Sequence, residues 1–123
     1  MSERPVVCVV DDDESVRESL PDLLREFGFD VRAFSSAKAF LASDGEQACE
    51  CLILDIAMPE MSGPDLHRAL RSRGREIPTV FITAQVDPKV GAQVLAQGAV
   101  TCLYKPFSQE ELLEALSAAL RSP

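Results

Sequence analysis

Five polar residues stand at the ends of apolar runs or just beyond them: Asp11, Asp12, Asp55, Thr83 and Lys105. Three carboxylates brought together would concentrate negative charge, and a hard divalent cation such as Mg²⁺ binds such oxygens while keeping waters that phosphate oxygens can replace. An ammonium and a hydroxyl would stabilise the remaining charge of a phosphoryl group in transfer. If one carboxylate acts as nucleophile, the product is an aspartyl-phosphate.

Asp55 is the best nucleophile of this set, because it stands alone at the end of "CLIL" (51–54) and is followed by turn residues. Asp11 and Asp12 are better placed to hold the metal. Taken singly, each residue has an ordinary structural alternative, such as a cap, a strand residue or a surface charge. Asp13 in particular could be the N-cap of a helix.

The elements that must position these residues alternate between short apolar strands and amphipathic helices. Strands are predicted at 6–10, 30–34, 51–54, 79–83 and 101–104, each followed by a helix. Such alternation predicts a parallel sheet with helices on both faces. Ligands bind beyond the carboxyl ends of the strands in such sheets, which is where all five polar residues would meet.

The helix signals vary in strength. The first predicted helix, which Asp13 or Glu14 opens and Gly28 ends, contains Pro21; a kink is expected there and not an end, because the apolar face continues. Ser35 or Ser36 can cap a short second helix, and 43–50 is predicted to be loop. A third helix begins at Gly63–Pro64 and ends near Gly74.

A fourth helix begins at Asp87–Pro88, with Val90, Val94 and Leu95 expected to face inward and Gly98 as its end. "SQEE" (108–111) is a capping box that opens the fifth. His67, the single histidine, is expected to be solvated.

Size and composition fit one soluble domain. The chain has 123 residues, a net charge of −8 and a pI near 4.6, so it is a poor nucleic-acid binder by itself. It shows neither a membrane-spanning stretch nor a signal peptide, which favours the cytoplasm. The four cysteines lack the spacing of a zinc site and are expected to be mostly buried.

Four stretches together resemble the receiver domain of two-component response regulators: "VVDDDESVRESL", "LDIAMPEMSG", "FITA" and "YKPF". "FSSAKAFL" and "GAVTCLYKPF" are most similar to the FixJ/LuxR-type branch. The resemblance implies an α/β, flavodoxin-like (CheY-like) fold with a doubly wound five-stranded parallel sheet, strand order 2-1-3-4-5, and five helices. It covers residues 1–123 as one receiver domain with no output domain, either a stand-alone receiver or a piece of a longer regulator, and the branch favours the second.

The resemblance also implies the site. A sensor histidine kinase would phosphorylate Asp55; Asp11, Asp12, Asp55 and the backbone carbonyl of Ala57 would hold Mg²⁺ or Mn²⁺. The phosphoryl group would be bound by Thr83, Lys105 and the backbone of Ala84, with Thr83 and Tyr104 as switch residues and a cis Lys105–Pro106 bond.

The implied output is a changed surface on the fourth helix, the fifth strand and the fifth helix, which a partner or a second copy reads as a phosphorylation-dependent homodimer. No direct nucleic-acid or membrane binding is implied for this domain, and no enzyme turnover beyond slow autophosphorylation from small donors and autodephosphorylation. The alternative is a phosphorylation-independent pseudo-receiver. A phosphatase is disfavoured, because Ala57 stands where such enzymes need a second acid.

Overall fold

The computed structural model describes residues 4–84 and 87–121, which form a five-stranded parallel sheet in the order β2-β1-β3-β4-β5. The strands are β1 (Val6–Val10), β2 (Asp30–Phe34), β3 (Cys51–Asp55), β4 (Thr79–Thr83) and β5 (Thr101–Tyr104). The helices are α1 (Glu14–Glu26), α2 (Ala37–Leu41), α3 (Gly45–Ala48), α4 (Gly63–Ser72), α5 (Pro88–Ala96) and α6 (Gln109–Arg121). The predicted strand order is confirmed.

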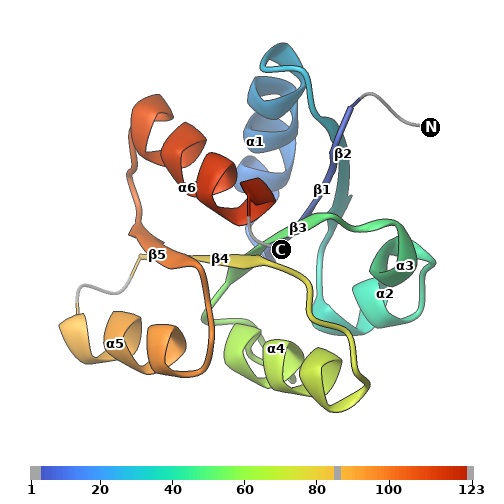
Figure 1. The fold of residues 1–123 in the computed structure, drawn as a ribbon, viewed down its shortest axis with the longest axis vertical. Helices are drawn as coiled ribbons and strands as arrows, with labels where there is room; N and C mark the ends of the chain where they lie inside the picture. The colour runs from blue at the N-terminus through green and yellow to red at the C-terminus, as the bar shows by residue number, and fades with distance from the viewer. Residues whose placement is uncertain (1–3, 85–86, 122–123) are drawn as a thin grey trace.

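Helices cover both faces of the sheet (Figure 1). α1 and α6 pack on one face over a core that includes Leu24, Ile53 and Leu116. α2, α4 and α5 pack on the other face with Phe40 and Phe81. The central strands β3 and β4 are therefore buried on both sides, as their continuous apolar sequences predict.

Local sequence signals set most of the helix ends. Ser36 and Ser62 accept the backbone N–H groups of Ala39 and Asp65, and Pro64 stands in the first turn of α4. Ser108 and Glu111 exchange two hydrogen bonds of 3.0 Å each, which is the predicted capping box. α1 continues without a break through the buried Pro21, as expected from its apolar face.

α4 ends at Ser72, near Gly74 as predicted. The structure corrects three expectations. The described residues contain six helices and not five, because 43–50 includes α3, one short turn beside the edge strand β2. Leu95 is 49% exposed, because α5 turns Val94 and not Leu95 toward the sheet.

The third correction concerns His67, which is 4% exposed and not solvated. Its ring packs edge-on against Phe81 of β4, with centroids 5.5 Å apart. α4 therefore buries a wider face than the pattern of leucines alone predicted. No helix within 4–84 and 87–121 combines the length and hydrophobicity that crossing a bilayer requires.

Candidate functional site

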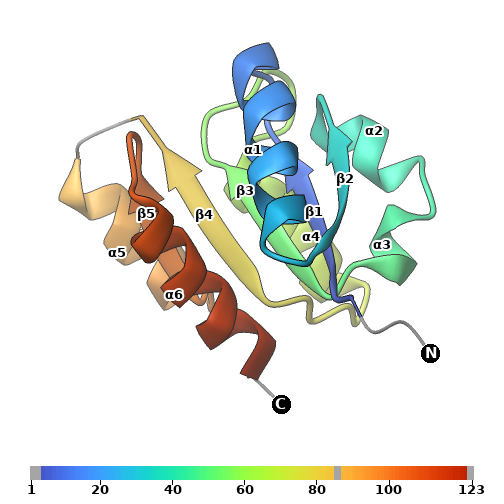
Figure 2. The same ribbon diagram turned by 90° about the horizontal axis from the view of Figure 1, so that it is seen from above.

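The carboxyl ends of the strands lie along one edge of the sheet, where the arrowheads in Figure 2 point. Asp55 ends β3 and is aligned with Ile82 of β4, while Thr83 is aligned with Tyr104 of β5. The backbone N–H of Lys105 donates to the Thr83 carbonyl at 2.8 Å, which keeps the ends of β4 and β5 together. The parallel register thus brings these residues to one place from segments far apart in sequence.

Three carboxylates form a cluster at this edge. Each of Asp11, Asp12 and Asp55 offers an oxygen that lies within 4.8 Å of the others. Asp11 is fully buried, Asp55 is 6% exposed, and Asp12 is exposed to solvent. The cluster is therefore open on the side of Asp12 and enclosed by protein on the other.

Lys105 supplies the cation of the site. Its Nζ lies 3.0 Å from Asp11 Oδ2 and 3.8 Å from Asp55 Oδ1. Burial disfavours the charged ammonium, but the hydrogen bond to Asp11 and the charge of Asp55 outweigh this and raise the pKa of Lys105. One ammonium thus faces two buried carboxylates, with a third nearby.

This charge imbalance is visible at Asp55. Burial, followed by repulsion from Asp11, raises the pKa of the Asp55 carboxyl to about 7, although Lys105 acts in the opposite direction. Part of this rise comes from the like charge of Asp11, which the single ammonium of Lys105 does not fully offset. Three oxygen donors with excess charge suit a hard divalent cation, so the residues present fit Mg²⁺ or Mn²⁺.

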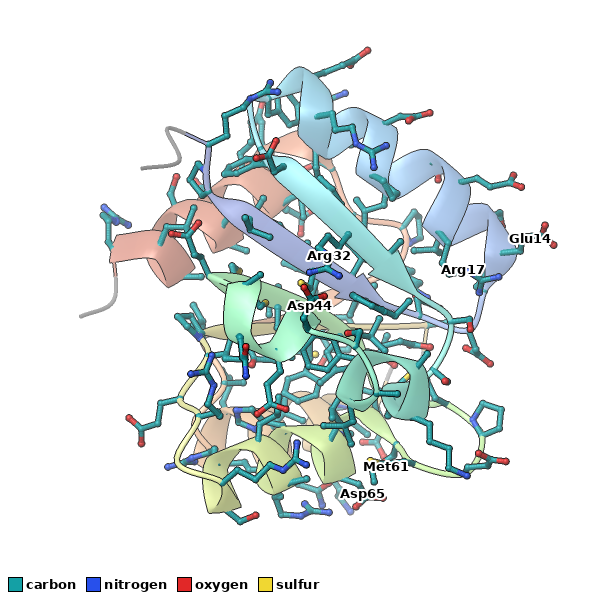
Figure 3. All side chains as sticks on the ribbon, turned by 90° about the vertical axis from the view of Figure 1, so that its right-hand side faces the viewer. Glu14, Arg17, Arg32, Asp44, Met61 and Asp65 are labelled. Carbon is teal, nitrogen blue, oxygen red and sulfur yellow. The ribbon has the colours of Figure 1, made fainter. Side chains whose placement is uncertain are left out.

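The chain around the cluster is fixed by backbone contacts that the sequence did not reveal. Asp11 Oδ1 accepts the N–H of Asp13 at 2.9 Å, and the Asp11 carbonyl accepts Arg17 Nη1 at 3.0 Å. Figure 3 shows Arg17 and Glu14 near the start of α1. Asp13 itself caps that helix through the N–H of Ser15, which is the structural alternative left open for it.

Gly63 approaches the end of β3 more closely than any larger residue could. Its N–H donates to the Ile56 carbonyl at 2.9 Å. A Cβ at this position would lie 2.1 Å from the carbonyl oxygen of Asp55. The turn after Asp55 therefore requires glycine for space, whereas the sequence identified Gly63 only as the start of a helix.

The other predicted site residues lie around this edge. Thr83 is buried at the end of β4, and Ala57 and Ala84 are exposed in the loops after β3 and β4. The Lys105–Pro106 peptide bond is cis. Tyr104 is 38% exposed on the edge strand β5, and its hydroxyl lies against Gly91 of α5.

Comparison with known proteins agrees with this geometry. Residues 7–117 match the family of the response regulator receiver domain. Response regulator protein TodT of Pseudomonas putida is 46% identical over 122 residues, which are 98% of this chain and 54% of TodT. Transcriptional regulatory protein FixJ of Rhizobium meliloti is 38% identical over 113 residues, covering 92% of this chain and 55% of FixJ.

Solved structures show the same relationship. The response regulator StyR superposes with a TM-score of 0.88 at 43% identity, over 96% of this chain and 60% of StyR. FixJ-N superposes with a TM-score of 0.88 at 35% identity, over 100% of this chain and 98% of its own. The chain spans about half the length of the curated relatives it matches. It belongs to the response regulator receiver domains of two-component systems, in the branch that includes FixJ.

Proposed function

We propose that Asp55 accepts a phosphoryl group from the phosphohistidine of a sensor kinase, with Mg²⁺ or Mn²⁺ bound by Asp11, Asp12, Asp55 and the backbone carbonyl of Ala57. The observation that carries the proposal is the position of Asp55, which lies 3.8 Å from Lys105 and shares a 4.8 Å cluster with Asp11 and Asp12. A single phosphoryl group bound here could therefore contact the nucleophile, the ammonium and the metal-binding oxygens together.

In the proposed reaction, a carboxylate oxygen of Asp55 attacks phosphorus, and the bond from phosphorus to the histidine nitrogen breaks. Lys105 pairs with one phosphoryl oxygen, the Thr83 hydroxyl donates to another, and the N–H of Ala84 donates to the phosphoryl group. When bound, the divalent cation supplies positive charge against the incoming phosphoryl oxygens. The rigid end of β3 holds the Asp55 carboxylate in place for attack.

The proposed output follows from the added charge. A phosphoryl group brings about one to two negative charges to a site already rich in carboxylates. Thr83 moves toward it, and Tyr104 on the adjacent strand end turns inward. The surface of α5, β5 and α6 then changes and forms a phosphorylation-dependent contact with a second copy or an attached output domain.

The proposal is tested by labelling with acetyl phosphate and Mg²⁺, followed by intact-mass measurement. The wild-type chain should gain one phosphoryl group, and Asp55→Asn should gain none. Asp22→Asn is the matched control, because Asp22 is an exposed carboxylate of α1 whose one ion partner within the described chain is Arg25. Equal labelling of Asp55→Asn and the wild type would contradict the assignment.

The same experiment separates the second candidate, a pseudo-receiver that works without phosphorylation. Such a module has no use for a lysine held against two buried carboxylates, and Lys105 is so held here. Receiver domains act as phosphoacceptors and not as turnover enzymes, so only slow self-dephosphorylation is proposed. Transcriptional output in the cytoplasm is proposed for a longer protein containing this domain, since the net charge of −8 disfavours direct DNA binding.

A further inference from the structure

The C-terminal end of α5 is joined to α4 through one residue, Gln97. Gln97 is the C-cap of α5. Its amide Nε2 lies 3.1 Å from the Pro64 carbonyl oxygen and 2.7 Å from His67 Nδ1, and its Oε1 accepts Arg68 Nη1 at 2.7 Å. Its backbone carbonyl also accepts a hydrogen bond from Arg71 Nη1. We call this set of contacts the Gln97 clamp.

The clamp partners dictate the orientation of the amide. A guanidinium can only donate and a carbonyl can only accept, so Arg68 must face Oε1 and Pro64 must face Nε2. The amide N–H group therefore donates to His67 Nδ1, and neutral His67 carries its proton on Nε2. Burial, followed by the charges of Arg71 and Arg68, lowers the pKa of His67 and keeps the ring neutral.

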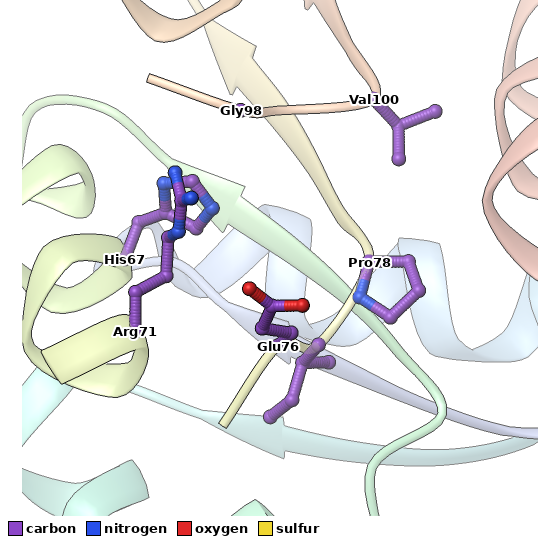
Figure 4. A pocket seen from close by; sticks show the side chains of 7 residues that line it. His67, Arg71, Glu76, Pro78, Gly98 and Val100 are labelled. Atoms are coloured by element: carbon purple, nitrogen blue, oxygen red, sulfur yellow. The ribbon is translucent and has the colours of Figure 1, made fainter. Parts of the chain in front are cut away.

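The clamp has a second support in Gly98, which follows Gln97. Its φ of 113° lies in the region that favours glycine, and a Cβ there would come within 2.6 Å of Arg71 Nη1. Figure 4 shows the side chains of His67 and Arg71 close together on α4, turned toward the segment that carries Gly98. They line one wall of a cavity of about 210 Å³, with Glu76, Pro78 and Val100 on its other side.

The clamp bears on Tyr104 through α5. Gly91 lies six residues before Gln97, about 9 Å along the helix axis. A Cβ on Gly91 would lie 2.5 Å from the Tyr104 hydroxyl, so the phenol is seated directly against the helix backbone. With the far end of α5 held to α4, the position of this seat relative to β5 is fixed.

We propose that Gln97 is a positioning residue: by clamping the end of α5 to α4, its amide sets the position of Gly91 and hence the seat of the Tyr104 ring. Loss of the clamp frees α5 to shift and the ring to leave its seat, while Asp55 on β3 keeps its surroundings. The regulatory meaning rests on the proposed switch role of Tyr104, but the clamp itself can be tested without phosphorylation.

The chain offers two single-residue reporters, since it contains one tyrosine and one histidine. With 3-fluorotyrosine incorporated, the ¹⁹F resonance reports Tyr104 alone, and ¹⁵N shifts of the imidazole report His67 alone. Gln97→Ala and Gln97→Glu should each shift or broaden the ¹⁹F resonance in the unphosphorylated protein. Both should also change the tautomer balance of His67, because neither an alanine methyl group nor a carboxylate offers an N–H to Nδ1.

Gln93→Ala is the matched control, because Gln93 is an exposed glutamine one turn earlier on α5 whose side chain makes no hydrogen bond among the described residues. Its spectra should superpose on those of the wild type. Wild-type ¹⁹F spectra in both Gln97 variants would overturn the proposal, whatever their melting temperatures. Gln97→Glu preserves the side-chain shape, which keeps the test available if Gln97→Ala folds poorly.

Labelling of Asp55 by acetyl phosphate distinguishes failure of this inference from failure of the proposed function. If the wild-type chain is labelled normally but the Tyr104 resonance is unchanged in both Gln97 variants, only the proposed role of Gln97 is rejected. If the wild-type chain is not labelled but the Tyr104 resonance shifts in the Gln97 variants, only the proposed phosphoacceptor role of Asp55 is rejected. Normal labelling with a shifted signal supports both.

Discussion

Replacing Gly63 by alanine tests the closest packing in the site. A Cβ at this position would lie 2.1 Å from the Asp55 carbonyl oxygen, whereas real Cβ contacts essentially never fall below 3.0 Å. The next two atoms it meets, the carbonyl carbon of Asp55 and Cα of Ile56, also belong to the main chain of this segment. The backbone must therefore move by close to 1 Å, because no flexible side-chain end is present to turn away.

Overpacking of a well-packed region costs roughly 1–3 kcal/mol and sometimes more. We expect a loss of about 3 kcal/mol of unfolding free energy for Gly63→Ala, because rigid main chain must yield. Gly91→Ala is the matched control, since both glycines lie in helices and are buried. The obstacle at Gly91 is the hydroxyl end of Tyr104, which is 38% exposed and can move aside.

Gly91→Ala should therefore leave stability within about 1 kcal/mol of the wild type, with the helix-propensity gain of alanine offsetting the displacement of the ring. Urea denaturation followed by far-UV circular dichroism measures both variants, and an unchanged slope of free energy against urea validates the comparison. Two results would refute the reasoning: a Gly63→Ala protein as stable as the wild type, or equal losses in the two variants.

Three further changes have expected outcomes. Lys105→Met leaves a fully buried carboxylate, that of Asp11, without its cation. Urea denaturation should show a loss of about 3 kcal/mol of unfolding free energy without Mg²⁺ and a smaller loss with Mg²⁺. Equal losses under the two conditions would contradict a shared metal site. The pKa of His67 is lowered by burial and by the two arginines beside it, so the unfolded chain binds its proton more readily. Stability should fall as pH drops below about 6.5, and this component should be absent in urea titrations of His67→Gln between pH 7 and 5.5. Ser108→Ala removes the capping box of α6 and should cost about 1 kcal/mol in thermal unfolding, whereas Ser117→Ala, an exposed change inside that helix, should cost nothing.

The short helix α3 was predicted to be loop, because the local sequence signals for a helix there are weak. α3 is a four-residue helix whose first residue, Gly45, packs against the ring of Phe34. Arg32 Nη2 of β2 lies 2.6 Å from Oδ1 of Asp44, the residue before α3. Figure 3 shows these two side chains next to each other. A segment this short has little helical stability of its own, so tertiary contacts decided it.

The predictions that His67 is solvated and that Leu95 faces inward were wrong for a related reason. Both lie in short amphipathic helices, where a rotation of a few tens of degrees exchanges an inward for an outward position. The partners that set the rotation come from elsewhere in the chain: Phe81 and Gln97 hold His67 inward. The hydrophobic periodicity of α4 or α5 alone cannot predict these partner residues.

The sequence by itself determined the sheet, its helices and the edge where chemistry gathers. Apolar β-branched runs that alternate with amphipathic segments admit a parallel sheet, and parallel strands bring Asp55, Thr83 and Lys105 to one edge whatever the details of packing. Only the tertiary structure decided that Gly63 must touch the carbonyl of Asp55 and that Gln97 fastens α5 to α4. Those contacts join residues far apart in sequence whose local preferences do not predict each other, so they exist only in the packed tertiary structure.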